Sequence, residues 1–420
     1  MAEPTHLRLG RDVAAGRRRA EGECAIAPDG LALGLEESVP AAARRIAQTV
    51  ALTAADAVDR EARFPNEAVT AMRRAGLLGA AIPRAFGGRG APFADIVAAC
   101  HELGQGCANA AMVFAMHQIQ IASLVRHTTG SAWHRDFLAR IAVEQLLIAS
   151  VTTEAGSGGD VRRSECAVQT TSGQMSVAKS GCVISYAEQA DAFLITARRA
   201  PESDAGDQVA VLARREQCVL DPVAQWDTLG MRGTCSRSYS LSVAADPAQV
   251  IPDSYATISA QTMLPVSHIT WSAAWLGIAS AACQRARRTV RRRAVPGGAA
   301  PAGSLRLTQA LAQLQALRSQ VADATRRFEA ADGDVDAMHS IAFALGMNQL
   351  KLTVSMGVVQ VIGEAMLASG LAGYRNDGAG SLGRHLRDAH SAALMIGNDR
   401  IIANCAALVS GYRGEEELFP

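Results

Sequence analysis

Apolar residues recur at helical spacing through much of the first 150 residues. Between residues 39 and 62 they leave Arg44, Arg45, Asp56 and Asp59 on other faces, which is the pattern of an amphipathic helix. The same spacing predicts helices over residues 66–75, 93–103, 109–126 and 131–143. We therefore expect a polar tail over residues 1–34 and an all-helical domain over residues 35–150.

The pattern changes after residue 151, where short apolar or β-branched segments are separated by turn-rich pieces. Such segments occupy residues 166–171, 183–186, 192–197 and 209–213, and Tyr239, Leu241 and Val243 alternate with polar residues further on. Short strands with frequent turns are typical of an antiparallel sandwich or barrel. We expect this β domain to span residues 151–254.

Helical spacing returns from about residue 255. Long helices are predicted over residues 271–290, 305–331 and 334–366, and a last one over residues 399–411. Several long amphipathic helices suit a four-helix bundle, here over residues 255–420. Helices, then strands, then helices again predict an α+β protein.

The composition argues against several classes of protein. The 420 residues are 4% aromatic and carry a formal net charge of +1, so a nucleic-acid-binding surface is not expected. The nine cysteines form no C-x-x-C pair, which predicts no metal site and reduced thiols in a cytoplasmic protein. We identify no signal peptide and no apolar run long enough to span a bilayer.

Residues 151–160 carry the strongest chemical pattern in the sequence. Two threonines and Glu154 are followed by a run of small residues that ends at Asp160. Residues this small let a ligand approach the backbone closely and leave amide N–H groups free for its oxygen atoms. We therefore expect a ligand-binding loop here.

This loop and several other segments resemble the acyl-CoA dehydrogenase family over residues 40 to 412. The segments are Phe64-Pro65, Ala75-Gly76-Leu77-Leu78-Gly79, Ile82-Pro83, Phe86-Gly87-Gly88-Arg89-Gly90, Thr153-Glu154-Ala155-Gly156-Ser157-Gly158-Gly159-Asp160, Leu229-Gly230-Met231-Arg232-Gly233-Thr234-Cys235-Ser236 and Arg387-Asp388-Ala389. The resemblance implies an acyl-CoA dehydrogenase-like fold with FAD held between the β domain and the bundle. It also implies a homodimer or homotetramer.

The resemblance assigns several residues to the flavin. Thr152, Thr153 and Gly158 would lie along it, and Gly159 stands where the family often has serine. Ser185 falls where the family places a hydroxyl near flavin N5, although Val183 replaces the usual aromatic residue.

Other residues correspond to the nucleotide side and to the reacting loop. Arg293 fits the arginine of an R-x-F-G turn, and Gln360 and Gly363 fit a Q-x-x-G-G turn whose second glycine is Glu364 here. Asn398 takes the place of a threonine near the flavin.

The catalytic base that the resemblance implies is missing. In most of the family it is a glutamate nine residues after the arginine of R-D-A, and here that position is Ile396. Asp399 is one candidate replacement, although an aspartate in the first turn of a helix is more often a cap. Other candidates are His385, His390 and the alternative family position, Ser267 beside His268; Glu154 is expected to order its loop instead.

Two chemistries remain open from the sequence. The first is FAD-dependent α,β-dehydrogenation of an acyl thioester, carried by CoA or by an acyl carrier protein, with an atypical base and an electron-acceptor flavoprotein or O₂. The second is a flavin-dependent monooxygenase that takes reduced flavin and O₂, which the missing glutamate favours. A relative without redox activity is a third alternative. Of the first two, the dehydrogenase is preferred from the sequence because the segments around residues 64–90 and 229–236 follow that branch.

Overall fold

The computed structural model describes residues 37–156, 160–296 and 298–412. Its N-terminal part is helical, as the spacing of apolar residues predicts. The helices are α1 (Val39–Ile46), α2 (Leu52–Arg60), α3 (Asn66–Arg74), α4 (Phe93–Gly106), α5 (Ala108–His127) and α6 (Ala132–Glu144). A π-helical turn, η1 (Ala47–Ala51), joins α1 to α2, so the helix predicted over residues 39–62 is continuous but not uniformly α-helical.

The middle part holds two sheets. One has the order β1 (Ile148–Val151), β4 (Ala192–Arg198), β5 (Gln208–Arg214), and the other the order β2 (Gln169–Thr171), β3 (Gln174–Ile184), β7 (Arg237–Ala245), β6 (Cys218–Ala224). β1 runs parallel to β4, so the prediction of a purely antiparallel domain is wrong at this strand. Parallel strands are joined by long connections and not by a short hairpin turn, so no local sequence signal predicts their pairing.

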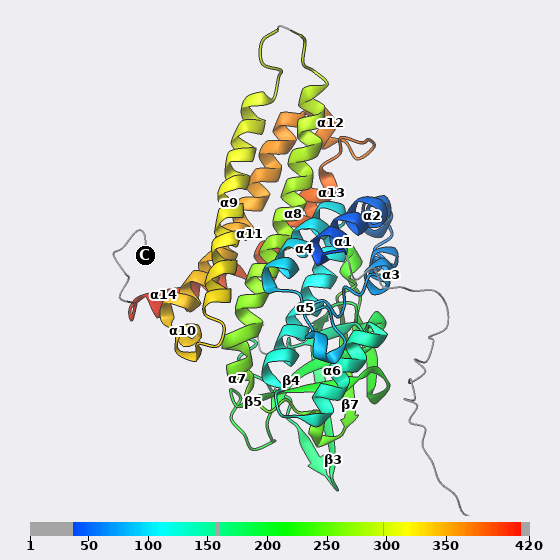
Figure 1. Cartoon of the computed structure of the whole chain (residues 1–420), viewed down its shortest axis with the longest axis vertical. Helices are drawn as coiled ribbons and strands as arrows, with labels where there is room; N and C mark the ends of the chain where they lie inside the picture. Colours follow the sequence, from blue (N-terminus) through cyan, green and yellow to red (C-terminus); the bar gives the residue numbers. More distant parts are fainter. Residues whose placement is uncertain (1–36, 157–159, 297, 413–420) are drawn as a thin grey trace, which may run out of the picture. The chain divides into compact units, whose positions relative to one another are not determined.

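The C-terminal part is helical again. Its elements are α7 (Tyr255–Ile258), the π-helical turn η7 (Ser259–Met263), α8 (Leu264–Arg291), α9 (Ser304–Ala330), α10 (Val335–His339), α11 (Ile341–Ser369), α12 (Leu371–Tyr374), α13 (Gly383–Leu394) and α14 (Asn398–Val409). Helices α8, α9, α11 and α13 pack together as a bundle (Figure 1). The helix predicted over residues 334–366 is split, because Ser340 Oγ accepts from Phe343 N at 3.1 Å and so caps the start of α11.

One large hydrophobic core joins the helices to both sheets. Phe114 of α5, Phe193 of β4 and Trp275 of α8 are among its largest fully buried side chains. Strand β3 contributes alternate residues to this core until its register with β7 shifts between Gly181 and Ile184. A bulge of this kind redirects the chain, and it does so just before Ser185.

Three described segments are long and apolar enough, by length and composition, to cross a membrane: Ala108–His127, Ile341–Ser369 and Gly383–Val409, the last of which comprises α13, a turn and α14. By that measure, the expectation that no apolar run reaches such a length is wrong. In the first segment 83% of the window is buried inside the protein, because α5 packs against α4 and α8.

Candidate active site

The loop after β1 lies against the end of β3. Thr153 Oγ1 donates to the Val183 carbonyl oxygen at 3.1 Å, and Val183 N donates to Thr153 Oγ1 at 3.4 Å. Ser150 Oγ donates to Thr152 Oγ1 at 3.5 Å. Thr152 and Thr153 are half-buried, so part of each side chain remains accessible. Gly158 and Gly159 lie outside the described residues.

Glu154 is a buried carboxylate that orders this loop. Its Oε2 accepts from Ser164 Oγ at 2.7 Å and from Glu165 N at 3.2 Å, and its Oε1 accepts from Cys166 N at 2.8 Å. Lys179 Nζ lies 3.6 Å from Oε2. Burial raises the pKa of Glu154, but the Ser164 hydroxyl, the Lys179 charge and the two amides together hold it below its ordinary value. Glu154 is therefore an ionised structural residue at neutral pH.

A chain of hydroxyl groups connects Ser185 to the protein interior. Ser185 Oγ lies 2.8 Å from Ser236 Oγ, which lies 2.8 Å from Thr234 Oγ1, and Thr234 donates to the Met231 carbonyl oxygen at 2.8 Å. Because a carbonyl oxygen only accepts, Thr234 uses its proton there, Ser236 donates to Thr234, and Ser185 donates to Ser236. Half-buried Ser185 is therefore left as a hydrogen-bond acceptor for a ligand.

The segment around residue 230 and the R-D-A segment of α13 hold each other through backbone groups. Arg387 Nη1 donates to the Leu229 carbonyl oxygen at 3.0 Å, and Met231 N donates to Asp388 Oδ1 at 2.8 Å. Arg387 Nη1 also donates to Asp59 Oδ1 of α2 at 3.1 Å. These contacts link the β sheets, the N-terminal helices and the bundle next to the site.

Asp388 gives this link a pH dependence that can be tested. Burial, only partly offset by Arg384, raises the pKa of Asp388 from an ordinary 3.8 to about 6. The stabilisation from the bound proton is therefore full below pH 3.8 and is lost as the pH rises through about 6. Asp388→Asn keeps an acceptor for Met231 N and should remove this loss, which is of the order of 3 kcal/mol. Urea unfolding of both proteins between about pH 4 and 7 measures it, and parallel profiles would contradict the expectation.

The segment between α13 and α14 is held by α11. Lys351 Nζ donates to the Ile396 carbonyl oxygen at 2.8 Å and to Asn398 Oδ1 at 2.6 Å, while Asn398 Nδ2 donates to Ser355 Oγ at 3.0 Å. Lys351 is completely buried, and desolvation lowers its pKa to about 8. Ile396 has a φ of 47°, a left-handed conformation that costs a β-branched residue of the order of 1–3 kcal/mol. The contacts from Lys351 hold this strained turn in place.

The residues named as candidate bases on α13 and α14 differ in accessibility. Asp399 is exposed in the first turn of α14, beside Ile396 and Asn398 in the sequence. His385 is buried in α13, and this burial holds its pKa well below the ordinary value. His390 is exposed in the second half of the same helix.

The alternative family position on α8 is occupied by internal contacts. Ser267 Oγ donates to the Leu264 carbonyl oxygen at 2.8 Å. His268 Nδ1 lies 3.1 Å from the Met347 carbonyl oxygen, and burial lowers the pKa of His268 to about 4. Within the described part of the chain, no carboxylate or imidazole forms a hydrogen bond with residues 396–398.

The structure brings the loop after β1 close to the start of α14. The pKa of Asp160 is lowered, mainly by a hydrogen bond from Arg162 and in part by the charge of Arg400. Asp160, at the end of this loop, and Arg400 of α14 therefore lie within electrostatic range of each other.

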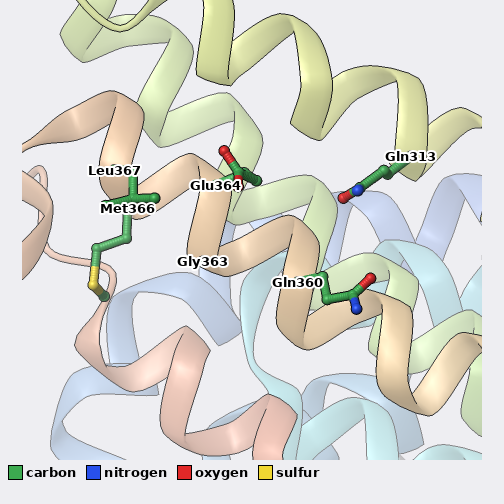
Figure 2. A pocket seen from close by; sticks show the side chains of 6 residues that line it. All are labelled: Gln313, Gln360, Gly363, Glu364, Met366 and Leu367. Carbon is green, nitrogen blue, oxygen red and sulfur yellow. The ribbon is translucent and has the colours of Figure 1, made fainter.

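Gln360 and Gly363 lie elsewhere, in a pocket of about 600 Å³ between α9 and α11. Gln313 faces them from α9, and Glu364, Met366 and Leu367 complete the lining (Figure 2). The expected turn at Gln360 is wrong: α11 continues through these residues to Ser369, and Gly370, with a φ of 60°, follows its last residue. Glu364, in place of the family's glycine, does not end the helix, so the local amides stay in intrahelical hydrogen bonds.

Arg293 stabilises the same end of α11. Its guanidinium donates to the carbonyl oxygens of Ala302 at 3.3 Å and Ala368 at 3.0 Å, and also to that of Ser369. A cation at a helix C-terminus is favourable because several carbonyl groups there have no intrahelical partner. Arg293 thus lies near the pocket but is engaged by the backbone.

Sequence reasoning missed Lys351 and Ser355, and it gave no role to Thr234 and Ser236. For Lys351 the available signal was a lysine in the otherwise apolar middle of a long helix. Thr234 and Ser236 belong to a segment that carries the resemblance, but their connection to Ser185 depends on the pairing of β3 with β7.

Comparisons with known proteins agree on the family. The model of the acyl-CoA dehydrogenase N-terminal domain matches residues 36–145, and that of the C-terminal domain matches residues 258–408. The chain is 29% identical over 359 residues to the amino sugar nitrososynthase DnmZ of Streptomyces peucetius, covering 80% of this chain and 84% of that one.

Solved structures agree with this fold. FMN-bound TdsC from Paenibacillus, a dibenzothiophene monooxygenase, superposes with a TM-score of 0.79 at 19% identity, covering 90% of this chain and 98% of that one. Butyryl-CoA dehydrogenase from Megasphaera elsdenii superposes with a TM-score of 0.72 at 17% identity, covering 91% and 100%. The α+β fold predicted from the sequence is confirmed, and the chain belongs to the acyl-CoA dehydrogenase family of flavin-dependent oxidoreductases.

Proposed function

We propose that this chain is a flavin-dependent monooxygenase on the acyl-CoA dehydrogenase fold. It would take reduced flavin and O₂ and transfer one oxygen atom to a nucleophilic amine nitrogen or aromatic carbon. The second oxygen atom leaves as water, with the two electrons supplied by the reduced flavin. The proposal reverses the preference that the sequence alone gave.

The observation that carries the proposal is the composition of residues 396–398. Dehydrogenation of an acyl thioester needs a positioned base for the α-proton, worth roughly 10²–10⁴-fold in rate. Here Ile396 occupies the glutamate's position, and the hydrogen-bonding side chains from α11 are Lys351 and Ser355. Oxygen transfer to an electron-rich substrate does not need that carboxylate.

The hydroxyl chain at Ser185 fits a flavin, and it fits the reduced form best. The reduced isoalloxazine ring carries an N–H at N5, whereas the oxidised ring has only a lone pair there. Ser185 donates its proton toward Ser236, so its free lone pairs suit an N–H donor. Thr152 and Thr153 would supply further contacts along the ring from the loop after β1.

The nucleotide side of FAD is less well matched. The Arg293 guanidinium donates to backbone carbonyl oxygens at the end of α11. The amides near Gln360 and Gly363 are engaged in hydrogen bonds within α11. If FAD is the bound flavin, its adenylate would meet the pocket at Gln313, Gln360 and Glu364 of a partner subunit. We propose a homodimer or homotetramer on this basis.

Two relatives support the choice of reaction. DnmZ is named as an amino sugar nitrososynthase, and the similarity covers most of both chains. TdsC is named as a monooxygenase. We also propose a cytoplasmic location, supported by the free state of the cysteines in the described residues.

One experiment separates oxygenation from dehydrogenation. Oxidised holoprotein is mixed anaerobically with acyl thioesters of several chain lengths, and the flavin absorbance should stay unchanged. In a second arm, a separate reductase supplies reduced flavin under ¹⁸O₂ with amino sugars, aromatic amines or heteroaromatics. We expect a product carrying one ¹⁸O atom. Bleaching by a thioester, without ¹⁸O product, would sink the proposal.

The dehydrogenase remains the second candidate, and several relatives favour it. The chain is 23% identical over 359 residues to cyclohex-1-ene-1-carbonyl-CoA dehydrogenase of Geobacter metallireducens, covering 82% of this chain and 89% of that one. In that case the substrate would be a CoA or carrier-protein thioester. Exposed Asp399 would be the base to test, and Asp399→Asn should then abolish bleaching.

A further inference from the structure

Lysine is almost absent from this chain. Of its 41 lysines and arginines only two are lysines, Lys179 and Lys351. Both are buried, with 3% and 0% of their surface exposed. A chain that uses arginine nearly everywhere has therefore kept lysine only at two interior positions. Lysine is a compact point charge with three rotatable donors, whereas the guanidinium is a wide planar fork.

Each lysine lies beneath one of the two loops of the candidate site. Lys179 Nζ donates to the Thr196 carbonyl oxygen at 2.6 Å and to Thr196 Oγ1 at 3.1 Å, and it lies 3.6 Å from Glu154 Oε2. Glu154 in turn accepts from the amides of Glu165 and Cys166. The ammonium group thus anchors the carboxylate that closes the loop after β1.

Lys351 plays the corresponding part at the second loop. It donates to the carbonyl oxygen of Ile396, the residue with a left-handed backbone, and to the side chain of Asn398. Its Nζ lies 6.0 Å from the centre of the Trp275 ring, within the range of a cation–π contact. Among the described residues no carboxylate pairs with Lys351, so its charge is balanced by dipoles and the ring.

We propose that Lys179 and Lys351 are positioning residues with separate tasks. Lys179 shapes the flavin-binding loop through Glu154, and Lys351 fixes the backbone reversal at Ile396 and the direction of Asn398 on the reacting side. The assignment rests on the proposed flavin site. It places the control of flavin affinity at one lysine and the control of turnover at the other.

The first test compares Lys179→Met and Lys351→Met in the full-length protein. Lys179→Met should weaken FMN or FAD binding by about tenfold or more, the size expected for losing an interaction with a charged group. Lys351→Met should leave flavin binding within about twofold and lower turnover at saturating flavin by about tenfold. Arg326→Met, which removes an exposed cation of α9, is the matched control and should change neither quantity.

Hydrogen exchange supplies a readout that needs no substrate. Amides of residues 395–400 should exchange faster in Lys351→Met alone, and amides of residues 153–156 and 160–166 faster in Lys179→Met alone. Acceleration of both segments in both variants, or of neither, would overturn the assignment. If exchange separates as expected but no oxygenation occurs, the positioning roles stand and the proposed function fails.

A double variant tests the part played by backbone strain. Ile396→Gly removes the cost of the left-handed conformation, because glycine adopts it freely. Loss of Lys351 should then accelerate exchange by less than about threefold in the Ile396→Gly background, against about tenfold in the parent. An equal effect in both backgrounds would show that Lys351 does not act through Ile396.

The native protein provides a measurement if either variant fails to fold. Selective ¹³C labelling at lysine Cε gives two resonances, since the chain has two lysines. The milder Lys351→Arg variant identifies one of them. Titration of the Lys351 resonance near pH 8 in the native protein supports a buried ammonium group at this position. An ordinary pKa near 10.4 would contradict a desolvated ammonium group at this position and overturn the role proposed for Lys351.

Discussion

Replacing Glu154 by alanine is expected to lower the free energy of unfolding by about 3–5 kcal/mol, because it breaks a buried charge pair by removing one partner. Lys179 would keep its buried charge without a carboxylate. The amides of Glu165 and Cys166 would lose the oxygen atoms that accept their protons. Urea unfolding followed by tryptophan fluorescence, at one protein concentration, measures the change.

Glu165→Ala is the control for this prediction. Glu165 is exposed and adjacent in the loop, so its replacement should stay within about 0.5 kcal/mol of the parent. Equal losses in Glu154→Ala and Glu165→Ala would show that the Glu154 contacts contribute little. Glu154→Ala should also bind flavin more weakly than Glu165→Ala does.

Gly230→Ala is expected to cost about 3 kcal/mol, although it adds a single methyl group. A Cβ at this position would overlap the Arg387 carbonyl group and come 2.6 Å from Asp388 N. Both are backbone groups of α13, so no side chain can rotate away. The helix has to shift, which also strains the hydrogen bond from Met231 N to Asp388.

Gly346→Ala provides the matched comparison. Gly346 lies inside α11, where an added methyl group would have no neighbouring atom within 4 Å, and alanine favours a helix by about 0.5–1 kcal/mol over glycine. That variant should be as stable as the parent or slightly more so. A similar loss at both positions, measured by urea unfolding, would contradict the close-approach argument for Gly230.

The helical parts of the fold were predictable because their information is local. Apolar spacing over residues 93–103 and 109–126 locates α4 and α5 to within a few residues. Gly76 ends its segment with a φ of 67°, as its place after α3 requires. The break at Ser340 was predictable in principle, since serine before a helical run is a common N-cap.

The errors come from non-local pairing and from one substituted residue. Strand β1 forms by pairing Ile148 with Ala192, and nothing near Ile148 indicates a parallel partner. At residue 364 a glutamate stands where the family has a glycine, and α11 continues to Ser369. The motif therefore indicated the family correctly and the local backbone wrongly.

The candidate site also has a part that the sequence could indicate and a part that depends on contacts between distant elements. The resemblance supplies the assignments of Thr152, Thr153 and Ser185, and these remain proposals. Lys351 and its contacts depend on α11 passing beneath residues 396–398, which no sequence spacing could show. The interior lysine was visible in the sequence, but its partners were not.

A π-helical turn holds one residue more than an α-helical turn, and η7 places such a turn at the entrance to the bundle. Thr262 Oγ1 in this turn lies 2.8 Å from His127 Nε2, so the turn is anchored to α5. A homologue with an uninterrupted helix here should be one residue shorter, without displacement of the flanking helices. Single-residue deletions are therefore expected to be tolerated at η7 and not within α8, where they would rotate the buried face away from α11.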